Sequence, residues 1–391
     1  MGQVYFDHAA TAPVRPEVVE AMLPYLHDIW GNPSSLHATG IRAAEGVERA
    51  RLHAAALIGA DAEEIVFTGS GTEADNHALI GGVFALRQKG EHVITSAIEH
   101  HAVLHTVDFL AETGCRVTVL PVDSTGTVDP DDVKAALTDR SVLVSIMHAN
   151  NEVGTIQPIV EIGAICRERG VLFHTDAVQT TGHVPIDVDA MNVDLLSVSA
   201  HKFGGPKGVG ALFIRAGVVL SSYMHGGGQE MGRRASTENV AGIVGMGEAA
   251  RLAKRDMVSD GADAVELRDL LMQEALRRVP GIRITGHPTR RLPNNASFCI
   301  PGVEGRAIVR ELDAAGFAVS SGSACTSGEL NPSHVLLAMG IAPDDARGSL
   351  RVSVGRGNTR EEVANLLEVL PGVVHRIRTS TSLADEQLAR A

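Results

Sequence analysis

The stretch Ser199-Ala200-His201-Lys202-Phe203-Gly204-Gly205-Pro206-Lys207-Gly208 places a lysine beside a serine and a histidine, in a loop that leads into glycines. It follows a short apolar run that is typical of a buried strand. The amine of a lysine in such a loop can condense with an aldehyde cofactor and hold it as a Schiff base. If Lys202 does this, other segments of the chain should supply partners for the remaining cofactor atoms.

Short apolar, β-branched runs alternate with helix-like stretches on both sides of this loop. The predicted strands are Ile65–Thr68, His92–Ser96, Arg116–Pro121, Val142–His148, Val171–Thr175, Leu195–Ser199 and Gly210–Ile214. The predicted helices are Arg42–Ile58, Glu73–Lys89, His101–Glu112, Asp131–Thr138 and Ile159–Glu168. This alternation predicts an α/β fold with a mostly parallel sheet covered by helices on both faces.

A long helical stretch is predicted over Thr237–Met257, and the pattern changes after it. A second helix, over Gly261–Val279, is followed by strands at Asn295–Ile300 and Val352–Val354. We therefore expect a large cofactor-binding domain over residues 15–260. Residues 1–14 and 261–391 are expected to form a smaller α+β domain.

The composition limits the classes of function. The 34 basic and 47 acidic residues give 34 − 47 = −13, which argues against a broad nucleic-acid or anionic-membrane surface. The N-terminus shows no leader pattern, and no apolar run approaches the length of a membrane span. Four widely spaced cysteines form no CxxC pair, so no zinc or other metal site is predicted. Reduced thiols in a cytoplasmic protein fit best.

A phosphate site is predicted where Thr68-Gly69-Ser70-Gly71-Thr72-Glu73 follows a strand and opens a helix. Glycines such as Gly71 allow close approach of the backbone, and the first turn of the helix offers free N–H groups and the positive end of its dipole. A capped turn without a ligand would have the same pattern.

Two further side chains follow predicted strands. Asp176 ends the strand that begins at Val171, and ligands of open α/β sheets lie beyond the carboxyl ends of strands. Its carboxylate could pair with a protonated pyridine nitrogen, with Gln179 near a phenolic oxygen, although an isolated aspartate there is more often a helix N-cap. His100 could stack on a flat ring and transfer protons, or be a solvated loop histidine.

Two polar segments suggest contacts with a substrate. Asn150-Asn151-Glu152 follows the strand that ends at His148, and an asparagine amide there could bind the cofactor oxygen or the substrate, or form an Asx-turn. Arg351 lies in a strand-like alternation, where an inward guanidinium can hold a carboxylate with two hydrogen bonds. A surface position on an edge strand is the alternative, and Arg356 is a competitor for this role.

Cys325 lies at the centre of Ser320-Ser321-Gly322-Ser323-Ala324-Cys325-Thr326-Ser327-Gly328-Glu329. This segment has little to pack and much backbone freedom, so it predicts a mobile loop. A thiol on such a loop can reach a substrate and carry an atom away. The other three cysteines lie in apolar surroundings typical of structural residues.

A Schiff-base lysine, a phosphate cradle, a strand-end acid and a stacking imidazole together describe a pyridoxal 5′-phosphate site. With them, the chain resembles the cysteine desulfurases of the NifS/IscS type, in the class V aminotransferase-like group of fold-type I pyridoxal-phosphate enzymes. The resemblance runs from the first strand to about Arg356. It is carried by Tyr5–Thr11, Gly31–His37, Gly71–Asn76, Glu99–Leu104, His148–Gly154, Asp176–Gln179, Ser199–Lys202, Met224–Glu230 and Ser321–Cys325. The long loop around Cys325 resembles that of the first group of the family.

The resemblance implies a role for each matching residue. Lys202 would hold the cofactor, Asp176 would keep the pyridine nitrogen protonated, and His100 would stack on the ring and transfer protons. The remaining implied roles are the ring oxygen region for Gln179 and Asn151, the phosphate for Gly71, Thr72, Ser199 and His201, the phosphate of the partner subunit for Thr237, and the substrate carboxylate for Asn32 and Arg351.

The implied reaction is removal of sulfur from L-cysteine, which yields L-alanine and a persulfide on Cys325. The implied partners are a second copy of the chain and a sulfur acceptor, with an iron–sulfur scaffold protein as the family expectation. Cys325 as a transient cluster ligand stays open. The alternatives are a selenocysteine lyase, a class V aminotransferase, a desulfurase dedicated to tRNA or DNA thiolation, and a sulfur-binding protein without catalysis.

Overall fold

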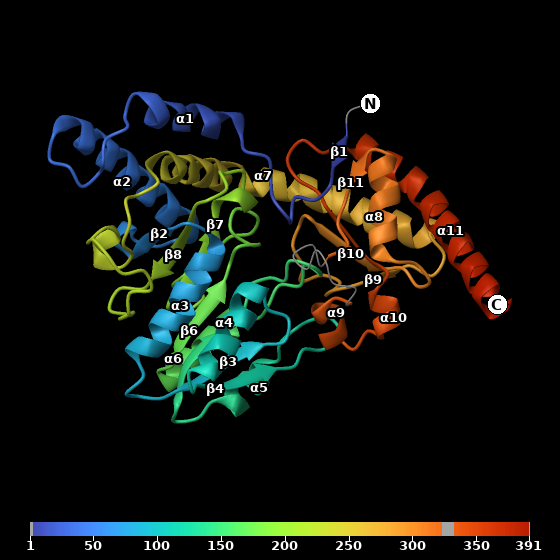
Figure 1. Cartoon of the computed structure of the whole chain (residues 1–391), viewed down its shortest axis with the longest axis horizontal. Coiled ribbons are helices and arrows are strands. Elements are labelled where there is room, and N and C mark those ends of the chain that lie inside the picture. Colours follow the sequence, from blue (N-terminus) through green and yellow to red (C-terminus); the bar gives the residue numbers. More distant parts are fainter. Residues whose placement is uncertain (1–2, 323–331, 391) are drawn as a thin grey trace.

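The computed structural model describes residues 3–322 and 332–390, so Cys325 lies outside the described residues. The predicted strands of the first part of the chain form one seven-stranded sheet (Figure 1). Its strands, in spatial order, are β2 (Ile65–Thr68), β8 (Gly210–Ile214), β7 (Leu195–Ser199), β6 (Leu172–Asp176), β5 (Ser141–Ser145), β3 (His92–Ser96) and β4 (Arg116–Leu120). β8 is antiparallel to both of its neighbours, and the other pairs are parallel.

Helices cover both faces of this sheet because its central strands are apolar on both sides. Phe173 and Phe213 point into one core together with Ile58 of a covering helix. Leu143 and Leu212 point into a second core on the opposite face. The helices of this part are α1 (Pro16–His27), α2 (Ala38–Ile58), α3 (Gly71–Ala85), α4 (His101–Glu112), α5 (Pro130–Ala136) and α6 (Ile159–Arg169), with the 3-10 helices η1 (Ala62–Glu64), η2 (Ala200–Lys202) and η3 (Glu230–Gly232). The predicted α/β class is confirmed.

A separate core forms in the last third of the chain. Phe298 and Leu350 from its sheet pack there with Phe6 from the N-terminal segment. The strands are β9 (Arg283–Ile284), β10 (Asn295–Cys299) and β12 (Ser349–Ser353), which are antiparallel, and β1 (Val4–Tyr5), which pairs in parallel with β11 (Phe317–Ala318). The helices are α8 (Gly305–Ala314), α9 (His334–Ala338), α10 (Pro343–Ala346) and α11 (Arg360–Arg390).

One long helix, α7 (Val240–Arg278), joins the two parts of the molecule (Figure 1). The prediction of two helices here was wrong. Gly261 lies inside α7, and a glycine costs a helix only about 1 kcal/mol relative to alanine, which packing at both ends of the helix outweighs. Met246 packs into the first core and Leu271 into the separate core. The predicted domain boundary at residue 260 stays a prediction, and it falls within this helix.

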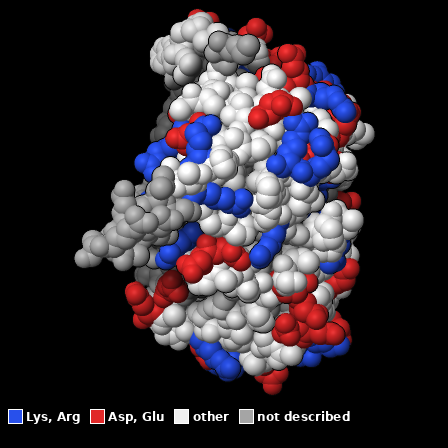
Figure 2. Space-filling model, turned by 90° about the vertical axis from the view of Figure 1, so that its right-hand side faces the viewer, with Lys and Arg blue, Asp and Glu red and all other residues white. Residues whose placement is uncertain are grey.

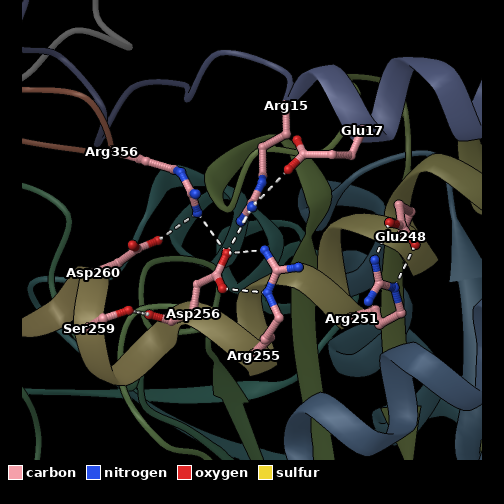
Figure 3. A network of polar contacts seen from close by, with 9 residues as sticks. All are labelled: Arg15, Glu17, Glu248, Arg251, Arg255, Asp256, Ser259, Asp260 and Arg356. Atoms are coloured by element: carbon pink, nitrogen blue, oxygen red, sulfur yellow. Dashed lines mark hydrogen bonds and ion pairs between the residues drawn. The ribbon is translucent and has the colours of Figure 1, made fainter.

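An ion-pair network lies at the middle of α7 (Figure 3). The Asp256 carboxylate is 2.8 Å from Arg15 Nη2 and 2.6 Å from Arg356 Nη1, and it also pairs with its neighbour Arg255. Arg356, the predicted competitor for a substrate carboxylate, is therefore engaged here. The network connects the segment before α1, the centre of α7 and the loop after β12.

The surface carries mixed charge. On the face seen in Figure 2, Lys and Arg side chains are interspersed with Asp and Glu side chains. Among the described residues, no helix is both long and apolar enough to cross a membrane.

Candidate active site

The site lies beyond the carboxyl ends of four neighbouring strands. His100 follows β3, Asn151 follows β5, Asp176 ends β6, and Lys202 follows β7. Because the carboxyl ends of parallel strands meet at the same edge of a sheet, the fold brings these segments together. The turn with Asn151 also contacts Arg351 of β12, as described below, so the site lies where the large sheet meets the last third of the chain.

The Lys202 amine is turned toward the N-terminal segment. Its Nζ donates hydrogen bonds to the carbonyl oxygens of Ala9, at 2.7 Å, and Ala10, at 2.9 Å. Gln179 Nε2 donates to the same Ala9 oxygen at 3.0 Å. Lys202 and Gln179, predicted from separate motifs, therefore share a backbone partner.

Asp176 is buried, with 6% of its surface exposed. Its Oδ1 accepts a hydrogen bond from the backbone N–H of Val178 at 2.8 Å. Burial raises the pKa of this carboxyl to about 6, while the Val178 N–H and the charge of Lys202 act in the opposite direction. Asp176 is thus ionised at neutral pH and can pair with a cation.

His100 is the N-cap of α4, where its Nδ1 accepts from the Ala102 N–H at 3.1 Å. Burial lowers the pKa of His100 to about 4, and the charge of Lys202 contributes. The imidazole is therefore neutral at physiological pH, which is the form that can accept a proton.

The predicted phosphate cradle is the start of α3. A Cβ on Gly71 would lie 2.8 Å from Val178 Cγ2 and 3.2 Å from Ser199 Cβ, so only a hydrogen fits at this position. Thr72, on the first turn of α3, is exposed, and Ser199 ends β7. His201 Nδ1 lies 3.1 Å from Thr11 Oγ1. Free N–H groups of a helix start, next to hydroxyl groups, suit an anion.

Arg351 has 2% of its side chain exposed, which rules out the surface alternative. Its Nη2 lies 2.8 Å from Asp7 Oδ1, and its Nη1 donates to the carbonyl oxygen of Asn151 at 2.8 Å. Its buried Nε has no hydrogen-bond partner among the described residues. Arg351 is therefore an inward guanidinium with hydrogen-bonding capacity left over.

Asn150 and Asn151 differ in what their side chains can do. The Asn150 amide is committed to the backbone, because its Nδ2 donates to Ile98 O and its Oδ1 accepts from the N–H groups of Glu152 and Val153. Asn150 thus forms the Asx-turn that the sequence left open. Among the hydrogen bonds of the described residues, Asn151 takes part only through its backbone carbonyl oxygen, so its side-chain amide is the one that could contact a ligand.

Two predicted residues lie apart from this group. Asn32, between α1 and α2, is exposed, and its Oδ1 accepts from the Ser34 N–H at 2.9 Å. Thr237, before α7, is also exposed. The described residues on either side of Cys325 border the site: Ser349 Oγ donates to the Ser321 carbonyl at 2.6 Å, and Ser333 Oγ donates to Glu152 Oε2 at 2.6 Å.

Sequence reasoning missed three buried polar residues near Asp176. They are Asp75 of α3, Glu99 before His100, and His174 of β6. A signal was present, because Asp75 follows Ala74 at a helical position that faces the sheet, where an apolar residue is the norm. The charges of Glu99 and Asp176 act on Asp75 only in the folded chain, so the relation of these acids to Asp176 was not visible in the sequence.

Comparison with known proteins places the chain in a family. Residues 4–366 match the aminotransferase class-V family. Cysteine desulfurase IscS of Methanosarcina thermophila is 51% identical over 98% of this chain and 95% of its own length. A solved structure described as a NifS-like protein superposes with a TM-score of 0.90 at 37% identity, covering 95% of this chain and 99% of that one. A structure of SspA in complex with cysteine has a TM-score of 0.82 at 34% identity, covering 91% and 100%. The chain therefore belongs to the aminotransferase class-V family, among its cysteine desulfurases.

Proposed function

We propose that this chain binds pyridoxal 5′-phosphate at Lys202, removes the sulfur of L-cysteine and carries it on Cys325. The observation that carries the proposal is the arrangement of Lys202, Asp176 and Gly71 at one edge of the sheet. A reactive amine, a buried carboxylate and an anion cradle lie there on adjacent segments. The cysteine complex of SspA supports the substrate.

The residues fit the cofactor. The cradle at Gly71 has no room for a Cβ but offers helix N–H groups to a phosphate. Asp176 provides a buried anion for a protonated ring nitrogen. When bound, pyridoxal phosphate supplies an electron sink that takes up the charge left on the substrate α-carbon and thereby weakens the Cβ–S bond.

The side chains of this chain would bind, orient and move protons. Lys202, whose amine donates to the carbonyl oxygens of Ala9 and Ala10, is the residue that would hold the cofactor. His100 is neutral because it is buried, and its Nδ1 accepts from the Ala102 N–H, so its proton lies on Nε2. Nε2 is therefore the atom that would give a proton and take it back. Arg351 would hold the substrate carboxylate, and the Asn151 side chain would contact the ring oxygen or the substrate. Asn32, which lies apart from Arg351 within one chain, stays a prediction for the same carboxylate.

The choice of thiol rests on the other cysteines. Burial raises the pKa of both Cys166 and Cys299 to about 12, so neither is a thiolate at neutral pH. Burial also raises the pKa of the half-buried Cys115. Only a thiolate is a good nucleophile. Cys325 is thus the thiol proposed to attack the substrate sulfur, so that an S–S bond forms while the Cβ–S bond breaks.

We also propose a homodimer and an iron–sulfur scaffold protein as the acceptor, in the cytoplasm. The dimer is supported by exposed apolar side chains beside Asn32: Trp30 is 73% exposed and Leu36 is 94% exposed. Thr237 is exposed as well, as a residue that reaches a partner's phosphate would be. The IscS name of the relatives supports the acceptor.

The proposal can be tested by comparing alanine variants of two lysines in the same loop. The purified protein is expected to show the visible absorbance of a lysine-bound pyridoxal cofactor, and to release sulfide and alanine from L-cysteine under reductant. Lys202→Ala should lose both properties. Lys207→Ala, an exposed position five residues on, should keep both. If Lys202→Ala kept the visible absorbance of a lysine-bound cofactor, the proposal would be overturned. A faster reaction with alanine or selenocysteine than with L-cysteine would also overturn it.

A further inference from the structure

Three carboxyl groups lie buried behind the edge of the sheet where Lys202 sits. Asp176 ends β6, Glu99 precedes α4, and Asp75 comes from α3, which packs against β6 and β7 (Figure 1). Asp75 is 2% exposed and Glu99 is fully buried. The charges of Asp176 and Glu99 both act on Asp75, and Asp176 acts on Glu99 as well. The three acids thus form one interacting cluster.

The cluster cannot carry three negative charges. The charge of Lys202 lowers the pKa of Asp176. Among the described residues, no cation contributes to the pKa shift of Asp75 or of Glu99. An unpaired buried charge costs several kcal/mol, and neighbouring like charges add to that cost. The anion therefore belongs on Asp176, the member of the cluster whose ionised form the charge of Lys202 favours.

Glu99 is fully buried and accepts hydrogen bonds from two donors. Its Oε1 lies 2.5 Å from Ser96 Oγ, and the Met147 N–H lies 3.0 Å from both carboxyl oxygens. These donors favour the ionised carboxyl, but burial outweighs them and raises the pKa of Glu99 to about 8, and the charge of Asp176 adds to the rise. Glu99 consequently keeps its proton at neutral pH.

Asp75 lies against a chain of neutral hydrogen-bonding groups. The nearest ring atom is His174 Nε2, 3.6 Å from Asp75 Oδ1, and this oxygen has no hydrogen-bond partner among the described residues. His174 Nε2 is 3.0 Å from Ser197 Oγ, and its Nδ1 is 2.8 Å from Ser145 Oγ. Burial lowers the pKa of His174 to about 3. Burial also raises the pKa of Asp75 well above its usual range, although a hydrogen bond with Ser197 acts in the opposite direction. The pair is therefore uncharged.

We propose that Asp75 and Glu99 are proton-holding positioning residues that leave Asp176 as the one anion under the cofactor ring, and that Ser197 and His174 orient Asp75. In this arrangement the Asp75 hydroxyl donates to Ser197, and the Ser197 hydroxyl donates to His174 Nε2. The inference rests on the cofactor placement proposed above. It explains how Asp176 can sit in an acidic cluster and still be the group that pairs with a ring cation.

The test is an infrared comparison of the holoenzyme with Asp75→Asn and Glu99→Gln, which preserve shape and remove the acid. At near-neutral pH each variant should lose the carbonyl stretch of a protonated carboxylic acid. Asp176→Asn, the matched control, should instead lose the bands of a carboxylate. In parallel, Asp75→Asn should shift the pH midpoint of the cofactor absorbance by less than about 0.3 unit, whereas loss of an ionised group there would lower it by about one unit or more.

Loss of carboxylate bands in Asp75→Asn or Glu99→Gln, or a midpoint shift of that larger size, would overturn the proposal. If a variant does not fold, isotope-labelled aspartate and glutamate in the wild-type protein identify the same bands. The proposed function fails separately, because a wild-type protein without cofactor absorbance would contradict it while the infrared bands still report on the cluster.

Discussion

Arg351 Nη2 and Asp7 Oδ1 lie 2.8 Å apart, so the guanidinium proposed for the substrate carboxylate is already paired with a carboxylate of the N-terminal segment. Asp7 therefore engages the Nη2 group of the Arg351 guanidinium. The second Arg351 contact, from Nη1 to the Asn151 carbonyl oxygen, leaves the buried Nε without a described partner. This geometry holds the guanidinium plane in place before a substrate arrives.

Arg351→Lys should raise KM for L-cysteine by about tenfold to a hundredfold. Lysine keeps the charge but not the planar fork, and a lost hydrogen bond to a charged group costs about 1.5–3 kcal/mol. Steady-state kinetics check this, and the cofactor absorbance should be unchanged. Arg356→Lys, in the exposed part of the Asp256 network, is the control and should leave KM as it is. An unchanged KM in Arg351→Lys would remove Arg351 from the substrate site.

Gly71→Ala should weaken cofactor binding about tenfold or more. Its Cβ would lie 2.8 Å from Val178 Cγ2, and relief of such crowding costs about 1–3 kcal/mol and displaces the cradle. Gly82→Ala in the same helix is the control, because its nearest neighbour, Leu172 Cδ1, is at an ordinary 3.5 Å. Titration of the cofactor-free proteins measures both affinities. Equal affinities in the two variants would place the phosphate elsewhere.

Asp176→Asn should make the cofactor-free protein more stable at neutral pH, although it removes the carboxylate proposed to pair with the cofactor ring. The folded-state pKa of Asp176 is raised from 3.8 to about 6. The wild type therefore loses stability as pH rises from about 4 to about 6, since the unfolded chain releases this proton first, and two pKa units correspond to about 2–3 kcal/mol.

The free energy of unfolding in urea, measured on cofactor-free protein across this range, checks the prediction. The advantage of Asp176→Asn over the wild type should grow between pH 4 and pH 6 and then level off. Asp123→Asn is a control of opposite sign, because hydrogen bonds from Thr125 and Thr127 lower the pKa of Asp123. A pH-independent difference for Asp176→Asn would mean that its carboxyl is not perturbed in the fold.

Much of the fold and of the site follows from local sequence. The strands could be predicted because short β-branched runs in a parallel sheet are apolar on both faces, and residues that follow such strands meet at one edge. Lys202, Asp176 and His100 could be found for this reason. The continuity of α7 could not, because it depends on packing at both of its ends rather than on Gly261.

Relations between distant segments also escaped prediction. Asp7 and Arg351 are separated by more than three hundred positions, and nothing local marks them as partners. The acids Asp75 and Glu99 could be noticed as unusual residues. Their electrostatic interaction with Asp176, which decides which of the three acids is ionised, arises only when α3 packs on the sheet. Cys325 stays a prediction from the composition of its segment and from the family resemblance, because it lies outside the described residues.

The most direct test of sulfur transfer to Cys325 is the mass of the protein after one turnover with L-cysteine, without reductant. The wild type should gain one sulfur atom on the peptide that contains Cys325 and release one alanine. Cys325→Ser should gain none and form alanine far more slowly, whereas Cys115→Ser should behave as the wild type. The account would be contradicted if Cys325→Ser formed alanine at the wild-type rate, or if the added sulfur were found on another cysteine.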